Sequence, residues 1–317
     1  MNSANNKKTA ALIIGFGGPT KAGEVQPFLQ SILEGSAIPP SRLEEVTRHY
    51  EVIGGCSPFN AVTLKQKEAL ERYFTSRSMA LPVGVAFRHS TPTFKDAFEM
   101  FKKFGVRKVV AFVMASFRSF VSSEWYREKA LQGRALAQAE TIEIVYTEAF
   151  DRLPLYLGAQ ADRIHSLWSS RRPKEKEETV VIYTAHSIPA SMCEQSCREN
   201  KNRCYGSQFY EAATTLSERL GLKNWFCAYQ SRTGNPRDRW MEPDVKEVIQ
   251  TIDTKKFKSV LLAPIGFLTD NVEVIYDLDI EARDCCLRQG LEYLRVPMVA
   301  DHPKFIEMMG SQILEKI

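Results

Sequence analysis

Residues 179–189 read TVVIYTAHSIP, a run of apolar and β-branched residues that ends in a histidine and, three positions later, a proline. Such a run predicts a strand buried on both faces of a parallel sheet, and the proline predicts its end. Runs of the same kind recur along the chain. They occupy residues 11–16, 83–87, 106–114, 142–146, 225–229 and 259–264.

Amphipathic segments separate these runs, with apolar residues returning every three or four positions. They occupy residues 62–74, 93–104, 124–138, 208–220 and 243–252. Alternation of buried strands with amphipathic helices is typical of an α/β protein whose parallel sheets are covered by helices on both faces. We therefore predict an α/β fold.

The chain also resembles itself. GFGGP at 15–19 has a counterpart in AHSIP at 185–189, and GVAFRHS at 84–90, carrying Arg88, corresponds to FCAYQSR at 226–232, carrying Arg232. KKFGVRKVVAFVM (102–114) likewise matches KKFKSVLLAPIGF (255–267) in the same order. Self-similarity of this kind predicts two copies of one doubly wound unit. We expect an N-terminal domain over residues 1–150, a C-terminal domain over 151–300, and a helix in 301–317 that packs back on the first domain.

The composition excludes several classes of protein. With 44% hydrophobic and 25% charged residues and a net charge of +4, the chain is globular and lacks the basic balance of a nucleic-acid-binding protein. Its longest apolar runs are far shorter than the roughly 20 residues of a spanning helix. The seven cysteines form an odd set, and the polar N-terminus lacks a secretory signal, so we expect a cytoplasmic protein with reduced or metal-bound thiols.

Ligands of open parallel sheets bind beyond the carboxyl ends of the strands, so residues 15–19 and 186–189 are expected around one shared cleft. His186 has two interpretations. It is either a core histidine bonded to a backbone carbonyl, or a proton acceptor or metal ligand, tasks to which imidazole is suited near neutral pH.

Glu273, Asp277 and Glu281 recur at four-residue spacing after the strand at 259–264. On a helix they share one face, where like charges repel, and no Lys or Arg stands in the intervening turns. The face is either simply solvated, or it is a row of oxygen ligands and proton carriers leading from solvent into the cleft.

Cys193, Cys197 and Cys204 form a C-x3-C-x6-C pattern directly after the histidine motif. Thiolates at short spacing suit zinc or an iron–sulfur cluster. Cys227 is the nearest candidate for a fourth ligand, and uncoordinated thiols are the alternative.

The motifs together resemble the ferrochelatase family nearly end to end. The matching pieces are GGPT (17–20), HYEVIGGCSPFN (49–60), FRHSTP (87–92), TAHSIP (184–189), YQSRTG (229–234), VEVIYDLDIE (272–281) and RVPMVADHPKF (295–305). The resemblance implies two flavodoxin-like domains that insert Fe2+, a substrate, into protoporphyrin IX to form protohaem. It also implies that His186 is the metal-site histidine and Glu273 its carboxylate partner.

By the same matching, Asp277, Glu281 and the residue at position 271 form a proton or iron path. The residues that the resemblance places against porphyrin are Phe16, Tyr50, Ser57, Arg88, Phe117 and Ser122. Some bacterial members carry a [2Fe-2S] cluster on an internal cysteine-rich stretch, which would here use Cys193, Cys197, Cys204 and Cys227. An apolar substrate also favours contact with a membrane surface, although no basic amphipathic helix marks one.

Three departures from the family pattern stand out. Asn271 follows Asp270 where the family usually has Asp-His, Arg118 stands where smaller or aromatic groups are usual, and YQSRTGNPRDRWMEP (229–243) carries extra charge. They leave two alternatives open. One is a chelatase for coproporphyrin III or another tetrapyrrole, and the other is a non-catalytic porphyrin-binding or redox-sensing homologue. The oligomeric state stays open.

Overall fold

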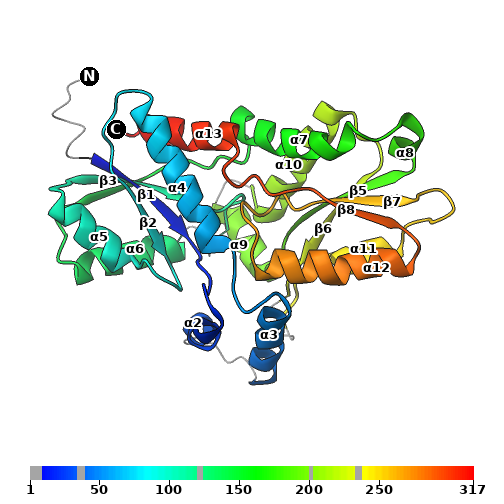
Figure 1. Ribbon diagram of the computed structural model, residues 1–317, viewed down its shortest axis with the longest axis horizontal. Coiled ribbons are helices and arrows are strands. Elements are labelled where there is room, and N and C mark those ends of the chain that lie inside the picture. The colour runs from blue at the N-terminus through cyan, green and yellow to red at the C-terminus, as the bar shows by residue number, and fades with distance from the viewer. Residues whose placement is uncertain (1–8, 34–39, 120–123, 200–202, 233–237) are drawn as a thin grey trace.

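The computed structural model describes residues 9–33, 40–119, 124–199, 203–232 and 238–317. The described chain forms two four-stranded parallel sheets with strand orders β2-β1-β3-β4 and β6-β5-β7-β8 (Figure 1). The strands are β1 Thr9–Gly15, β2 Val83–Phe87, β3 Lys108–Val113, β4 Glu143–Tyr146, β5 Thr179–His186, β6 Trp225–Gln230, β7 Ser259–Ala263 and β8 Glu292–Arg295. The predicted α/β class is confirmed, while β8 was not predicted.

The two sheets have corresponding topology, as the internal similarity predicts. β1 pairs with β2 and β3 in the first sheet, and β5 pairs with β6 and β7 in the second. All seven residues of β1 and the first seven of β5 are buried, which explains their uninterrupted apolar sequences. The carboxyl ends of these two strands carry the turns at 15–19 and 186–189.

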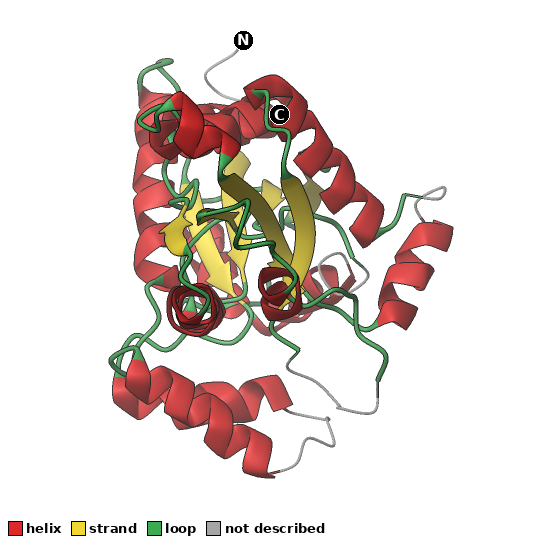
Figure 2. Cartoon of the chain, turned by 90° about the vertical axis from the view of Figure 1, so that its right-hand side faces the viewer, coloured by secondary structure: helices red, strands yellow, loops and turns green. Residues whose placement is uncertain are grey.

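Helices cover the sheets, and Figure 2 shows them on both sides of the strands. They are α2 Val25–Leu33, α3 Pro40–Val52, α4 Phe59–Thr75, α5 Phe94–Lys103, α6 Tyr126–Leu136, α7 Pro154–Trp168, α8 Pro173–Glu177, α9 Ala190–Glu199, α10 Tyr205–Leu220, α11 Val245–Gln250, α12 Arg283–Arg288 and α13 Pro303–Leu314. A short 3-10 helix, Ala22–Glu24, precedes α2, and a π-helix, Val274–Ala282, precedes α12.

Helices α2 and α3 form a projection beneath the two sheets, which the sequence did not predict (Figure 1). Phe28 and Tyr50 lie in a small apolar cluster of their own, against which Val272 packs. Because Val272 precedes Glu273, the projection contacts the segment that carries the first acid of the predicted path.

One apolar core runs through both halves. Phe112 of β3 stacks on Phe150 with ring centroids 5.1 Å apart, and both contact Phe305 of α13. Helix α13 also lies against α4, where a Cβ added at Gly310 would lie only 2.1 Å from the Tyr73 ring. The C-terminal helix therefore packs on the first half. Within the described ranges, no helix combines the length and apolar content needed to cross a bilayer.

Candidate active site

His186 is the last residue of β5, and its side chain is 28% exposed. Its Nε2 lies 3.1 Å from Oε1 of Glu273, and its Nδ1 hydrogen-bonds the carbonyl oxygen of Ser187. The carbonyl oxygen and the carboxylate both accept hydrogen bonds, an arrangement that favours the imidazolium, in which both ring nitrogens donate. Burial disfavours that charge, but the negative charge and hydrogen bond of Glu273 outweigh it and raise the pKa of His186 to about 9.

Glu273 lies at the start of the π-helix that carries Asp277 and Glu281. The i→i+5 hydrogen bonds of a π-helix widen each turn beyond 3.6 residues, so acids four positions apart keep nearly the same face. The expected row of acids is thus present, on a π-helix. Turns of this type occur frequently at functional sites.

Asp277 is the middle acid of the row, and its carboxylate accepts a hydrogen bond from the hydroxyl of Ser231. Burial, with the nearby charges of Glu273 and Glu281, raises the pKa of Asp277 to about 7 despite that bond. Ser231 has a φ of 65°, in the left-handed region that a non-glycine residue rarely adopts. A carboxyl group that titrates near neutral pH is suited to passing protons.

Lys246 of α11 compensates the negative charge of Glu281 at the outer end of the row. Its Nζ lies 2.8 Å from Oε2 of Glu281. The sequence indicated acids without a compensating cation, because Lys246 is 35 positions away and the fold alone brings it there. Glu281 is therefore paired with a cation from another helix, although no Lys or Arg stands in the turns between the acids.

Asn271 caps the turn that carries Glu273. Its Oδ1 accepts a hydrogen bond from the backbone N–H of Val274 at 3.0 Å, as a capping side chain does at a helix start. The structure thus gives the residue in the usual histidine position a local structural contact. Its predicted part in a proton path stays a prediction.

On the porphyrin side predicted for the first half, Phe16 is 37% exposed and its ring lies 4.7 Å from that of His89. Tyr50 is 2% exposed, and burial together with the charge of Glu273 raises its pKa. The ring of His49 on α3 stacks on that of Tyr276 in the π-helix, with centroids 3.6 Å apart, so α3 of the first half lies beside the acid-bearing helix of the second half. Arg88 lies over the ring of Trp125, with its guanidinium carbon 4.3 Å from the ring centroid.

Two other predicted porphyrin contacts are buried, as Tyr50 is. Ser57 is buried, and its backbone N–H donates to the carbonyl of Pro19 at 2.8 Å. Phe117 is 3% exposed and its ring packs 5.6 Å from that of Phe209, which makes it a core residue in this structure. Ser122 lies outside the described residues.

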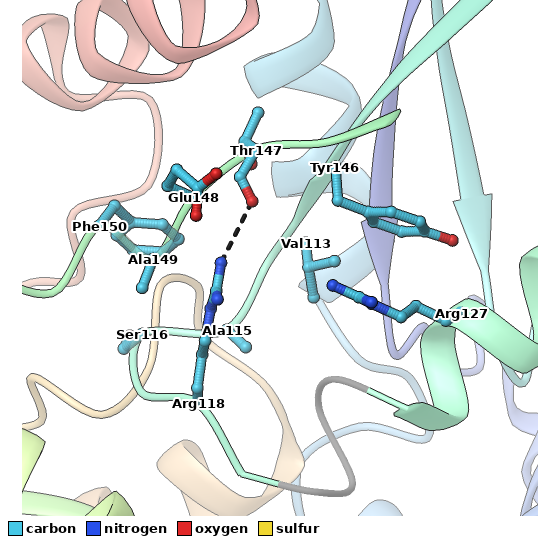
Figure 3. A pocket seen from close by; sticks show the side chains of 10 residues that line it. All are labelled: Val113, Ala115, Ser116, Arg118, Arg127, Tyr146, Thr147, Glu148, Ala149 and Phe150. Carbon is cyan, nitrogen blue, oxygen red and sulfur yellow. Dashed lines mark hydrogen bonds between the residues drawn. The ribbon is translucent and has the colours of Figure 1, made fainter. Parts of the chain in front are cut away.

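Arg118, a departure from the family pattern, lies in a small pocket beyond the carboxyl ends of β3 and β4 (Figure 3). Its guanidinium donates to the carbonyl of Thr147 at 3.2 Å, and burial lowers its pKa. Arg127 of the next helix lines the same pocket and lies over the ring of Tyr146.

The cysteines do not form the expected ligand set in the described part of the chain. Burial and the neighbouring Cys204 and Cys197 raise the pKa of Cys193 to about 11, so these thiols lie near one another. Cys227 is a strand residue whose pKa burial raises to about 12. No group of three His, Cys, Asp or Glu side chains among the described residues is arranged to hold a metal ion.

Comparison with known proteins identifies the family of the chain. A sequence model of the ferrochelatase family matches residues 8–317. The chain is 32% identical over 308 residues to a protein named ferrochelatase from Rhodopirellula baltica, covering 96% of this chain and 85% of that one. It is 34% identical over 311 residues to the coproporphyrin III ferrochelatase of Propionibacterium freudenreichii, covering 96% and 86%.

Among solved structures, the cobalt complex of the sirohydrochlorin chelatase SirB from Bacillus subtilis subspecies spizizenii is similar in fold. The TM-score is 0.55 at 13% sequence identity, and the match covers 97% of this chain and 94% of that one. Because the family match spans nearly the whole chain, we conclude that this protein belongs to the ferrochelatase family.

Proposed function

We propose that this ferrochelatase inserts Fe2+ into coproporphyrin III. The pairing of His186 Nε2 with Glu273 Oε1 at 3.1 Å is the observation that carries the proposal. An imidazole and a carboxylate supply one nitrogen and one oxygen ligand to a divalent metal. Ligand bonds of about 2.1 Å in tetrahedral geometry put two donor atoms about 3.4 Å apart, so the pair needs to open only slightly.

The reaction must release two protons, because a free-base porphyrin loses both pyrrole N–H protons when the metal binds. His186 enters the reaction with its own proton, since Glu273 favours the imidazolium. That proton must leave before Nε2 can bind metal or accept a pyrrole proton. Asp277, with a pKa of about 7, is the nearest group in the acidic row suited to receive it.

The acidic row forms a path along which released protons can leave the site. Glu273 faces His186, Asp277 follows one turn later and is held by Ser231, and Glu281 is held by Lys246 at the outer end. Iron entering along the same row would meet oxygen ligands at each step, which hard divalent cations accept. In the proposal, the row therefore serves proton exit or metal entry.

The choice of coproporphyrin III rests on named relatives. The Propionibacterium freudenreichii and Mycolicibacterium smegmatis proteins, 34% and 29% identical to this chain, are both named coproporphyrin III ferrochelatases. Protoporphyrin IX, the substrate expected from the family resemblance, is the second candidate, because the name of the Rhodopirellula baltica protein specifies no porphyrin.

Anaerobic insertion assays test both parts of the proposal. Fe2+ or Zn2+ is added to the purified protein with coproporphyrin III or protoporphyrin IX, and metalloporphyrin absorbance is followed. We expect insertion with a higher kcat/KM for coproporphyrin III. A higher value for protoporphyrin IX would reverse the substrate assignment. A shift of the free-base spectrum without metal insertion would instead indicate a porphyrin-binding protein.

The [2Fe-2S] cluster stays a prediction, for which the described residues give no evidence. Cys193 and Cys204 lie near each other, but Cys227 is a residue of β6. The absorbance of anaerobically purified protein between about 300 and 600 nm, with iron and sulfide analysis, checks it. Stoichiometric iron and sulfide lost in Cys193→Ser would establish the cluster, and colourless, iron-free protein would exclude it.

A further inference from the structure

Gln208, on the first part of α10, holds a loop of the opposite half of the molecule. Its side chain is 2% exposed. Its Oε1 accepts from the backbone N–H of Arg118 at 2.9 Å, and its Nε2 donates to the backbone carbonyl of Arg118 at 3.1 Å. One buried amide therefore satisfies both main-chain groups of a residue 90 positions away.

The same helical turn reaches the metal-site histidine. Tyr205 stands three residues before Gln208, a spacing that places both side chains on one helix face. Its hydroxyl donates to the backbone carbonyl of His186 at 3.0 Å, and its ring lies 6.0 Å from that of Phe117. This turn thus contacts His186 on one side and the segment around Arg118 on the other.

The segment after β3 is fixed at two points. Gln208 holds the backbone of Arg118, and the carbonyl of Thr147 accepts from its guanidinium (Figure 3). The first half uses the same device at the turn after β1, where the Asn60 amide pairs with both the N–H and the carbonyl of Gly18. The turns after β1 and β3 are thereby each held by one buried primary amide.

We propose that Gln208 is a positioning residue for chelation, which sets residues 114–119 after β3 against the porphyrin while Tyr205 sets the backbone of His186. This inference rests on the proposed function, because it assigns residues 114–119 to the porphyrin side of the cleft. It predicts that Gln208 and Tyr205, on one turn of α10, separately affect porphyrin binding and the chemistry at His186.

The test compares Gln208→Met with Tyr205→Phe in the full-length protein. Gln208→Met should raise KM for coproporphyrin III about tenfold, as loss of a buried hydrogen-bond partner does, and leave KM for Fe2+ within about twofold. Tyr205→Phe should lower kcat and shift its pH profile, with KM for porphyrin unchanged. In Gln208→Met, the porphyrin Kd, measured by fluorescence quenching, should rise as much as the porphyrin KM does.

Gln66→Met is the matched control. Gln66 of α4 is also fully buried, and its Nε2 also bridges the two halves, donating to the carbonyl of Ala300 at 2.8 Å. Gln66→Met should lower Tm without changing KM for porphyrin. A Gln208→Met protein with wild-type porphyrin KM, or with losses that match those of Gln66→Met, would overturn the inference.

If Gln208→Met does not fold, Gln208→Glu decides the question, because it keeps the acceptor for the Arg118 N–H and loses the donor to its carbonyl. A porphyrin KM raised several-fold supports the inference, and an unchanged value contradicts it. Failure of the proposed function is distinguishable, since the wild-type protein would then insert no metal at all or would have a higher kcat/KM for protoporphyrin IX than for coproporphyrin III.

Discussion

The turn at 15–19 and the turn at 185–189 follow corresponding strands of two similar sheets, yet they carry different chemistry. The first is held by Asn60 and presents the half-exposed ring of Phe16. The second ends in His186, hydrogen-bonded to Glu273. In the proposed function, the first half contacts the flat porphyrin, and the second half binds the metal and transfers protons.

The neighbours of the two turns account for this difference. A π-helix follows β7, and Glu273, the residue directly before it, meets His186. The corresponding segment after β3 contains Phe117 and Arg118 and is tied to α10 by Gln208. The two sheets thus correspond in strand order but differ in the segments after β3 and β7, and in the proposed function this difference gives the two cleft edges separate tasks.

The largest effect is expected from His186→Ala. We predict a loss of about 100- to 10,000-fold in kcat, the range for removal of a general acid–base group, with porphyrin Kd nearly unchanged. Phe16→Ala, the matching change in the first half, should instead weaken porphyrin binding and alter kcat little. Stopped-flow insertion assays and fluorescence titration separate the two. Near-normal kcat in His186→Ala would contradict the division of tasks.

Glu273→Gln should lower the pKa of His186 from about 9, because the charge of Glu273 favours the imidazolium. In the wild type, the raised pKa contributes stability that is present below pH 6.5 and lost as pH rises through about 9. The variant should lose less stability over that interval. Histidine NMR titration and Tm at pH 6 and pH 9.5 measure both effects, and an unchanged pKa would disprove the coupling.

Asn60→Ala removes the amide that holds Gly18. The backbone N–H and carbonyl of Gly18 lose their buried partner, which should cost about 1–3 kcal/mol of unfolding free energy. Denaturant unfolding measures this cost. We expect KM for porphyrin to rise and the pH profile of kcat to stay unchanged, since the change lies in the first half. A shifted pH profile would count against the separation of the two edges.

The smallest effect is expected from Lys246→Met. Lys246 and Glu281 are both more than one-third exposed, so their ion pair should contribute less than about 1 kcal/mol. KM for Fe2+ should change no more than about threefold, most visibly at low ionic strength. A tenfold or larger change would show that Lys246 controls metal entry, which would enlarge the chemical role of the second half.

Sequence patterns predicted much of this fold. The run at 83–87 matches β2 in full, and the strand before His186 begins at Thr179 as expected. These strands are buried on both faces, so their apolar runs are continuous. Strand β8 is only four residues long and partly exposed, which leaves no such run. Helices α2 and α3 pack mainly on each other and on Val272, contacts that periodicity does not reveal.

The site was predicted in part. The family motifs indicated His186 and Glu273, and the structure brings them together. Ser231 was part of a quoted motif, but its contact with Asp277 depends on a left-handed backbone conformation that serine does not signal. Lys246, Tyr205 and Gln208 act across long sequence separations, so their partners become visible only in the folded chain.

Anomalous diffraction from crystals soaked anaerobically with Zn2+ tests the central claim most directly. The account predicts a metal peak about 2.0–2.1 Å from Nε2 of His186 and about 2.0–2.2 Å from a carboxylate oxygen of Glu273, lost in His186→Ala. A peak bound elsewhere, with the hydrogen bond between His186 and Glu273 intact, would contradict it.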